Sequence, residues 1–329
     1  MINLNENYRN SLNNYRFIDL FCGIGGFHLA LSSFGAQCVF ACDIDRNVQK
    51  VYEKNFKMMP QGNITKIKNK EIPSHEILCA GFPCQPFSIS GAQNGFDDPR
   101  GKLFFEIIRI ARYHKPQIIL LENVKNLRKH DNSNTYEVMR KSLNDIGYYV
   151  FDKIFAASDF GIPQARERLY IVAIKKSLRV KQFEFPATIE ESISLNNILC
   201  DESEKYDVNI TREYTINPQV LKRKGLIQVA RIGKGRQGER IYSPDGFAVT
   251  LSSQGGGLGG KTGMYLINNS VRKLYPRECA RLMGFPDEFH YASSAATAFK
   301  QFGNSVVVDV LQNIIREIVD QLHIGGNNG

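Results

Sequence analysis

The sequence lacks the long apolar run that a membrane-spanning helix requires. It also lacks the features of a signal peptide, because residues 1–16, MINLNENYRNSLNNYR, are polar and rich in asparagine. A hydrophobic content of 43% and a charged content of 23% are typical of a globular protein with an ample core. We therefore expect a cytoplasmic protein that makes no membrane contact.

No pair among the seven cysteines is spaced as Cys-x-x-Cys. Cys38 with Cys42 and Cys79 with Cys84 are the pairs most similar in spacing to metal ligands. No histidine or second cysteine pair lies close enough in the sequence to complete four ligands. The pattern disfavours zinc, so we expect no metal and mostly reduced thiols.

The glycine pattern of a dinucleotide site, Gly-x-Gly-x-x-Gly, is also missing. Gly23 and Gly25 follow a predicted strand in FIDLFCGIGG, but His28 stands where the third glycine would be. Such a turn lets a ligand approach the backbone, and Asp43 at the end of the next predicted strand can bind ribose hydroxyls. An adenosine ligand without a pyrophosphate, such as S-adenosylmethionine, fits better than a dinucleotide. A tight turn with no ligand is the alternative.

Predicted strands and helices alternate through the first half of the chain. We predict strands at 17–21, 38–45, 75–81, 116–124 and 168–174, and helices at 27–35, 103–114 and 136–147. This alternation indicates a doubly wound α/β fold with a mostly parallel sheet. The pattern breaks near residue 187, and helices return at 276–284 and 306–322, the last packing back on the first domain. We expect one large domain (1–189 plus 276–329) and a smaller, glycine-rich domain (190–275).

The net charge of +9 is unevenly distributed. Residues 215–275 hold ten lysines and arginines against Glu239 and Asp245, whereas residues 187–214 carry an excess of acids. A basic, glycine-rich block in an otherwise balanced chain is the pattern expected for polyanion binding. A solvated basic face is the alternative.

Chemically capable side chains lie at the ends or the start of three predicted strands. Cys84 lies between two prolines in GFPCQPFSISG, Glu122 follows an apolar run, and Arg166 and Arg168 alternate at the start of another strand. Taken alone, Cys84 is more often structural, and Glu122 could be a helix-capping or ribose-binding acid. Together they offer a thiolate for carbon 6 of cytosine, an acid for N3 and a cation. That addition makes carbon 5 reactive toward a sulfonium methyl, on a base that has left the helix.

These residues stand in segments that resemble the cytosine-5 DNA methyltransferase family. The matching segments are FIDLFCGIGGF, GFPCQPFS, ENV, QARER, RECARLMGFP and QFGNSV, in the family's order along nearly the whole chain. The resemblance implies a methyltransferase fold that binds S-adenosylmethionine and releases S-adenosylhomocysteine, with a target-recognition domain over 190–275.

The resemblance also implies roles for individual residues. Cys84 would be the nucleophile, Glu122 would bind N3 and the exocyclic amine, and Arg168 would contact O2 with Arg166 in support. The implied cofactor residues are Phe21, Gly23, Gly25, Asp43, Ile44, Asn63, Ile64, Pro83, Leu103 and Asn304. The implied DNA-binding residues are Ser88, Ser90, Gln237, Arg240 and Thr250. Gln237 would fill the space left by the flipped base, and Arg240 would read guanine.

Several positions depart from the family's pattern. Asp43 replaces the usual glutamate, Ile44 the usual aromatic residue and Asn63 an acid near adenine. Gln228 and Gln254, in the predicted recognition domain, also depart from the pattern, so the DNA sequence that the protein recognizes stays open. We predict a restriction–modification enzyme that acts as a monomer on duplex DNA, with GCGC as the site and a cognate endonuclease as a possible partner. The alternatives are a transfer RNA cytosine methyltransferase, a catalytically silent DNA-binding regulator and a thiol-dependent pyrimidine enzyme that uses no DNA.

Overall fold

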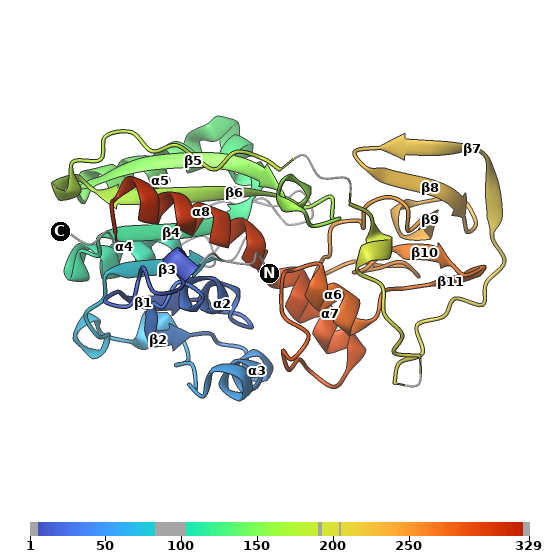
Figure 1. Ribbon diagram of the computed structural model, residues 1–329, viewed down its shortest axis with the longest axis horizontal. Helices are drawn as coiled ribbons and strands as arrows, with labels where there is room; N and C mark the ends of the chain where they lie inside the picture. The colour runs from blue at the N-terminus through green and yellow to red at the C-terminus, as the bar shows by residue number, and fades with distance from the viewer. Residues whose placement is uncertain (1–5, 83–102, 190–192, 204, 325–329) are drawn as a thin grey trace. The chain divides into compact units, whose positions relative to one another are not determined.

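The computed structural model describes residues 6–82, 103–189, 193–203 and 205–324 (Figure 1). Pro83, Cys84, Ser88 and Ser90 lie outside the described residues. The chain forms two compact units, and each is described by itself. The first contains Ile2–Phe155, Glu167–Ala187 and Val310–Gly329, and the second contains Ala156–Arg166 and Thr188–Asp309.

The first unit is built on a six-stranded sheet in the order β2-β1-β3-β4-β6-β5. The strands are β1 (Arg16–Leu20), β2 (Gln37–Cys42), β3 (Ile77–Gly81), β4 (Ile118–Val124), β5 (Tyr148–Ala156) and β6 (Glu167–Lys175). Strands β2, β1, β3 and β4 are parallel, while β6 runs antiparallel to β4. The predicted α/β fold with a mostly parallel sheet is confirmed.

The first unit contains six α-helices within its described residues. They are α1 (Glu6–Arg9), α2 (Gly26–Ser32), α3 (Arg46–Phe56), α4 (Leu103–His114), α5 (Asn134–Asp145) and α8 (Val308–Gln321). Helix α4 has the predicted bounds, and it buries Phe104, Ile107 and Ile110 in the same core as β1, β3 and β4. The amide of Gln312 in α8 donates to the Ser33 hydroxyl at 2.9 Å, so the last helix packs on the first domain as predicted.

Helices α1 and α3 and strand β5 of this unit were not predicted. Strands β3 and β4 each begin two residues later than predicted, and β2 ends early. The strand predicted at 38–45 ends at Cys42, because Asp43 leaves the sheet and the side chain of Asp45 caps α3 by accepting from the Asn47 amide at 2.9 Å.

The second unit contains a five-stranded sheet in the order β11-β10-β9-β8-β7 (Figure 1). Its strands are β7 (Thr215–Arg223), β8 (Leu226–Arg231), β9 (Arg240–Tyr242), β10 (Met264–Ile267) and β11 (Ser270–Arg272). Helices α6 (Pro276–Arg281) and α7 (Ala295–Asn304) belong to the same unit. The predicted recognition domain ends at residue 275, whereas the compact unit continues to Asp309. The functional boundary therefore stays a prediction.

Candidate active site

Glu122 and Arg168 form an ion pair on neighbouring strands. Arg168 Nε lies 3.1 Å from Glu122 Oε1, and the side chains are only 15% and 10% exposed. Since β6 is antiparallel to β4, Arg168 near the start of β6 pairs in register with Val124 at the end of β4. The antiparallel strand thus brings a cation to the edge of the sheet where the carboxyl ends of the parallel strands lie, which is where functional groups gather in α/β folds.

Asn123 is a buried residue of this site that the sequence analysis missed. Its side chain is 1% exposed, and its amide donates to the carbonyl of Phe82 at 3.2 Å. Asn123 therefore anchors the chain directly after β3. A polar residue beside Glu122 in the ENV segment, after a strand of apolar residues, was the signal that could have identified it.

The turn after β1 has the backbone conformation that the glycines predict. Phe21, Gly23 and Gly25 all have positive φ, at 55°, 52° and 93°. A Cβ on Gly25 would lie 2.2 Å from Cε2 of Phe56, whereas a Cβ on Gly23 would meet nothing within 4 Å. Gly25 is thus required by the protein's own packing, and Gly23 borders open space.

Asp43 is tied to this turn by its side chain. Its Oδ2 accepts from the Gly23 amide at 3.0 Å, and its Oδ1 accepts from the Asp45 amide at 2.9 Å. Burial raises the pKa of Asp43, although the hydrogen bonds from these amides oppose the shift. Ile44, the next residue, is 74% exposed. A carboxylate offers about four lone-pair sites, so Asp43 can still accept from a ligand hydroxyl.

The other predicted cofactor residues occupy different environments. The side chain of Asn63 accepts from the Thr65 amide at 3.0 Å and so begins the short 3-10 helix Ile64–Lys66. Ile64 is buried in the core of the first unit. Leu103, the first residue of α4, is partly buried and packs against that core. Asn304, the last residue of α7, is exposed in the second unit.

Arg166, which we predicted to alternate with Arg168 on one face at the start of a strand, lies just outside that strand. Strand β6 begins at Glu167, so Arg166 precedes it and belongs to the second unit. The residue is 2% exposed, and its guanidinium donates to the carbonyls of Leu251, Gly303 and Ser305. Arg166 is thus bonded to backbone carbonyls of its own unit, and its supporting role beside Arg168 stays a prediction.

The predicted DNA-binding residues of the second unit lie in its glycine-rich part. Gln237 begins the 3-10 helix Gln237–Glu239 and is exposed, as is Arg240, whose Nε donates to the Gly235 carbonyl at 3.3 Å. Thr250 is partly buried, and its hydroxyl donates to the carbonyl of Ala165. Gln228 is partly buried in β8, and Gln254 is exposed.

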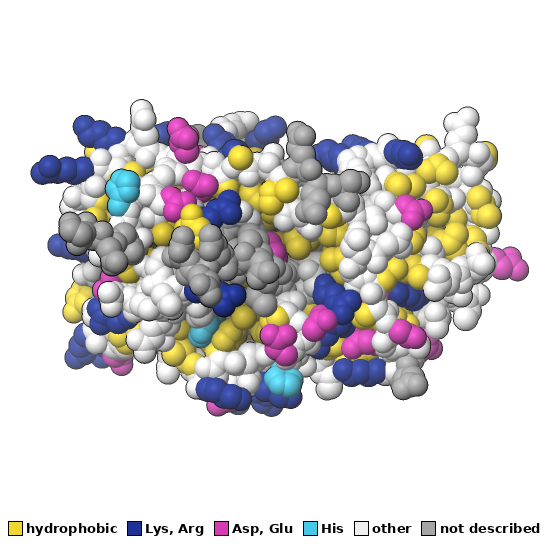
Figure 2. All heavy atoms as spheres, viewed as in Figure 1, with side chains coloured by type: hydrophobic (Ala, Val, Ile, Leu, Met, Phe, Trp, Pro, Cys, Tyr) yellow, Lys and Arg dark blue, Asp and Glu magenta, His cyan; other side chains and the backbone are white. Residues whose placement is uncertain are grey.

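Most lysines and arginines of the basic block are exposed, whereas Arg272 is buried. Lys222, Arg223 and Lys224 are exposed at the end of β7, the edge strand of the five-stranded sheet. The same strand exposes Ile216 and Leu221, and apolar side chains are visible over this part of the molecule in Figure 2. The end of β7 is therefore a basic, exposed part of the second unit.

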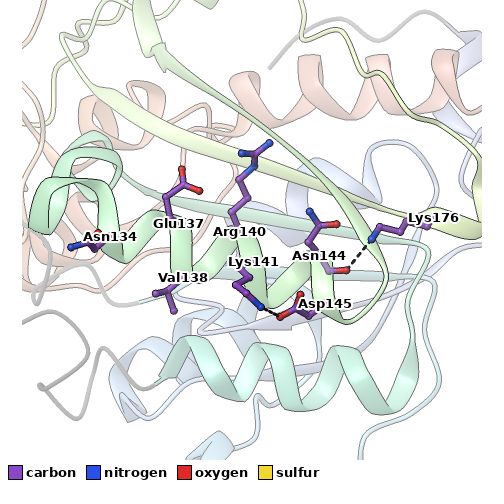
Figure 3. A pocket seen from close by; sticks show the side chains of 8 residues that line it. All are labelled: Asn134, Glu137, Val138, Arg140, Lys141, Asn144, Asp145 and Lys176. Carbon is purple, nitrogen blue, oxygen red and sulfur yellow. Dashed lines mark hydrogen bonds and ion pairs between the residues drawn. The ribbon is translucent and has the colours of Figure 1, made fainter.

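A surface hollow on α5 lies in the first unit (Figure 3). Its lining includes the exposed ion pair of Lys141 with Asp145 and the ammonium of Lys176, which donates to the Asn144 carbonyl at 3.0 Å. None of the predicted site residues lines it. Within the described part of the chain, no cluster of three or more His, Cys, Asp or Glu side chains could hold a metal ion, and no helix is both long and apolar enough to cross a membrane.

Comparison with solved structures places the fold among methyltransferases. The Entamoeba histolytica methyltransferase EhMeth superposes with a TM-score of 0.71 at 22% identity, covering 94% of this chain and 98% of EhMeth. The Schizosaccharomyces pombe Dnmt2 methyltransferase gives a TM-score of 0.67 at 23% identity, covering 94% of this chain and 99% of that protein.

Sequence comparison identifies the family. Residues 15–320 match the family described as C-5 cytosine-specific DNA methylase. The type II methyltransferase M.HhaI of Haemophilus parahaemolyticus is 48% identical over 315 residues, which are 95% of this chain and 96% of M.HhaI. M.HpaII of Haemophilus parainfluenzae is 37% identical, covering 96% of this chain and 92% of M.HpaII. The chain belongs to the C-5 cytosine-specific DNA methylase family and is a DNA (cytosine-5-)-methyltransferase.

Proposed function

We propose that this enzyme methylates carbon 5 of a cytosine that is flipped out of a short duplex site, through a covalent bond to Cys84. The observation that carries the proposal is the buried ion pair of Glu122 with Arg168 beside the end of β3. Gly81, the last residue of β3, pairs with Glu122. Cys84 follows Gly81 by three positions, a reach of about 10 Å even for an extended chain.

The residues around the first turn fit S-adenosylmethionine. Open space borders Gly23, and Asp43 presents carboxylate oxygens beside it, which suits the hydroxyls of a ribose. The exposed side chain of Ile44 offers an apolar surface for an adenine ring. When bound, this cofactor supplies the methyl group on an electrophilic sulfonium. Phe21, Gly25, Asn63, Ile64, Pro83, Leu103 and Asn304 complete the proposed cofactor set.

In the proposed reaction, the thiolate of Cys84 adds to carbon 6 of the cytosine. In its protonated form, Glu122 donates a hydrogen bond or a proton to N3 through one oxygen and accepts from the exocyclic amine through the other, which makes carbon 5 nucleophilic. Arg168 holds Glu122 in place and contacts O2 of the base. After carbon 5 is methylated, loss of its proton and of the Cys84 thiolate restores the aromatic ring. The nucleotide must first leave the stack, at a cost of a few kcal/mol.

The DNA site that we propose is GCGC. The support is the pair Gln237 and Arg240, both exposed in the glycine-rich part of the second unit. Arginine can donate to O6 and N7 of guanine in the major groove, and Gln237 would occupy the space of the flipped base opposite Ser90. Ser88 and Thr250 are further proposed DNA contacts, and the basic end of β7 would add attraction for the backbone. Gln228 and Gln254 are the positions at which a different site would arise.

We further propose that the enzyme is the methyltransferase of a restriction–modification system. The support is the family and its type II relatives. In this role it would act as a cytoplasmic monomer, and a cognate endonuclease would cut the same site when the site is unmethylated.

The test is methyl transfer from labelled S-adenosylmethionine to a pool of short duplexes, half of them carrying 5-fluorocytosine. Fluorine cannot leave as a proton does, so a covalent adduct on a denaturing gel traps the intermediate and identifies the site. We expect an adduct that is lost in Cys84→Ser and kept in Cys200→Ser, a matched change at a partly buried thiol. Turnover of ordinary DNA with no adduct would refute the covalent route. Tight duplex binding with no methylation would favour the silent regulator, and preference for transfer RNA would favour the RNA enzyme.

A further inference from the structure

Leu251 is held by both of its backbone polar groups. The side-chain oxygen of Gln164 accepts from the Leu251 amide at 3.0 Å, and Nη1 of Arg166 donates to the Leu251 carbonyl at 2.9 Å. Both side chains are buried, at 0% and 2% exposure. This backbone segment therefore cannot turn without breaking two buried hydrogen bonds, one of them from a charged donor.

The same guanidinium reaches the end of α7. Nη2 of Arg166 donates to the carbonyl of Gly303 at 3.2 Å and to that of Ser305 at 2.6 Å. These carbonyls flank Asn304. Since the guanidinium is planar, one side chain fixes the spacing between Leu251 and the turn that carries Asn304.

Close backbone packing joins the same two segments. A Cβ on Gly303 would lie 2.3 Å from the carbonyl carbon of Ser252 and 2.5 Å from the nitrogen of Ser253. Only a glycine permits this approach. The end of α7 and residues 251–253 are thus in direct contact in addition to being bridged by Arg166.

Thr250 is fixed by the segment that carries Gln164 and Arg166. The Ala165 amide donates to the Ala248 carbonyl at 2.9 Å, and the Ala248 amide donates to the Pro163 carbonyl at 2.7 Å. The Thr250 hydroxyl donates to the carbonyl of Ala165. Residues 163–166 are therefore hydrogen-bonded both to the segment that carries Thr250 and Leu251 and to the turn at 303–305.

We propose that Gln164 and Arg166 are positioning residues. They hold Thr250, the proposed DNA contact, and Asn304, the proposed cofactor contact, in one rigid block. This inference rests on the proposed function, which assigns Thr250 and Asn304 to those two ligands. Arg166 then acts on both ligands without touching either. Its role differs from that of Arg168, which faces the base.

The test compares binding of S-adenosylhomocysteine, by calorimetry, with binding of a methylatable duplex, by fluorescence anisotropy. Arg166→Met weakens both by about 10-fold, in line with the loss of charged hydrogen bonds. Asn304→Ala weakens only S-adenosylhomocysteine, and Thr250→Val weakens only the duplex. In the double variants, Arg166→Met adds little to Asn304→Ala for S-adenosylhomocysteine and little to Thr250→Val for DNA, because Arg166 works through those residues.

Arg281→Met is the matched control. Arg281 also donates to two backbone carbonyls of this unit, those of Ile198 and Leu199, and it forms an ion pair with Asp287; its hydrogen bonds go to no residue of the proposed block. We expect its effects to be small and additive with those of Asn304→Ala and Thr250→Val. Arg166→Lys keeps the charge without the planar fork and serves if Arg166→Met does not fold; it should lose part of both affinities.

The outcomes separate the inference from the proposed function. If the wild-type enzyme binds both ligands but Arg166 variants combine additively with Asn304→Ala and Thr250→Val, the positioning role is refuted and the proposed function stands. If the wild-type enzyme methylates no duplex and binds neither ligand, the proposed function fails and the inference fails with it.

Discussion

The carboxylate of Glu122 lies 3.1 Å from the guanidinium of Arg168, and the two residues are on antiparallel neighbouring strands. In a sheet that was parallel throughout, the start of β6 would lie at the opposite edge from the end of β4. The reversal of β6 therefore makes the pair possible and places it where a flipped base is proposed to bind.

Arg168→Met should impair both stability and catalysis. It leaves the carboxylate of Glu122 without this ion partner in a mostly buried site, so we expect a loss of about 3 kcal/mol of unfolding free energy. We also expect kcat for methyl transfer to fall by about 10²-fold or more, because the proposed contact of Arg168 with the reacting base is lost. Urea unfolding and single-turnover methylation measure the two effects. A normal rate in folded Arg168→Met would contradict the assignment.

The two glycines of the first turn should give opposite results. In Gly25→Ala the new methyl group collides with Phe56 in the positive-φ turn, so we expect a loss of about 3 kcal/mol of stability. In Gly23→Ala the methyl group points into open space, so the cost is about 1 kcal/mol for the backbone alone. If that space holds the cofactor, Gly23→Ala raises KM for S-adenosylmethionine. An unchanged KM would place the cofactor elsewhere.

Glu278 should matter for stability rather than for chemistry, although it lies in the family segment RECARLMGFP. It is fully buried, forms two hydrogen bonds with Arg272 at 2.7 and 2.8 Å, and accepts from the backbone amides of Tyr275 and Cys200. Glu278→Gln should lower the unfolding free energy by about 3 kcal/mol, since it breaks a buried ion pair.

The control for Glu278→Gln is Asp145→Asn, which breaks the exposed pair with Lys141. This exposed i,i+4 pair should cost no more than about 0.5 kcal/mol. Both variants should retain the wild-type rate of methyl transfer once folded. A rate loss in Glu278→Gln larger than its unfolded fraction explains would show that the segment acts on the reaction directly.

The elements that the sequence predicted well are those with one dominant apolar face. Helix α4 is an example, because its apolar residues recur at helical spacing and bury themselves in the core. Helix α3 was missed since, of its eleven residues, only Val51 and Tyr52 are buried. Strand β5 was missed because its burial does not alternate and Asp152 lies within it, held by Arg128.

The individual residues of the site could be predicted from the sequence, but the contacts between them could not. Glu122 and Arg168 each stood out as polar residues at the end or the start of an apolar run. The antiparallel direction of β6 brings the two residues together. It could not be predicted from the alternation of strands and helices, because that alternation indicates parallel pairing. Arg166 stands two positions before Arg168, yet its partners are carbonyls far along the chain, at Leu251, Gly303 and Ser305. No local pattern could have indicated them.

The stability of the first unit should fall in mild acid because of His28. The ring of His28 stacks on Phe56 with centroids 3.9 Å apart, its Nδ1 lies 2.7 Å from the Tyr52 hydroxyl, and burial lowers its pKa to about 4. The folded protein keeps this histidine neutral, whereas the unfolded chain takes up a proton below its ordinary pKa of 6.5. The unfolded state therefore binds more protons, so stability is lost as the pH falls from about 6.5 toward 4, by at most about 3 kcal/mol.

Urea unfolding at several pH values between 7 and 4.5 measures this slope. His28→Gln, which cannot titrate, should show a shallower decline than the wild-type enzyme even if its stability at neutral pH is lower. His323→Gln, at an exposed histidine, is the matched control and should keep the wild-type slope. His75, whose pKa burial also lowers to about 4, remains in both variants and should leave a residual decline. Equal slopes for His28→Gln and the wild-type enzyme would show that His28 does not couple folding to pH.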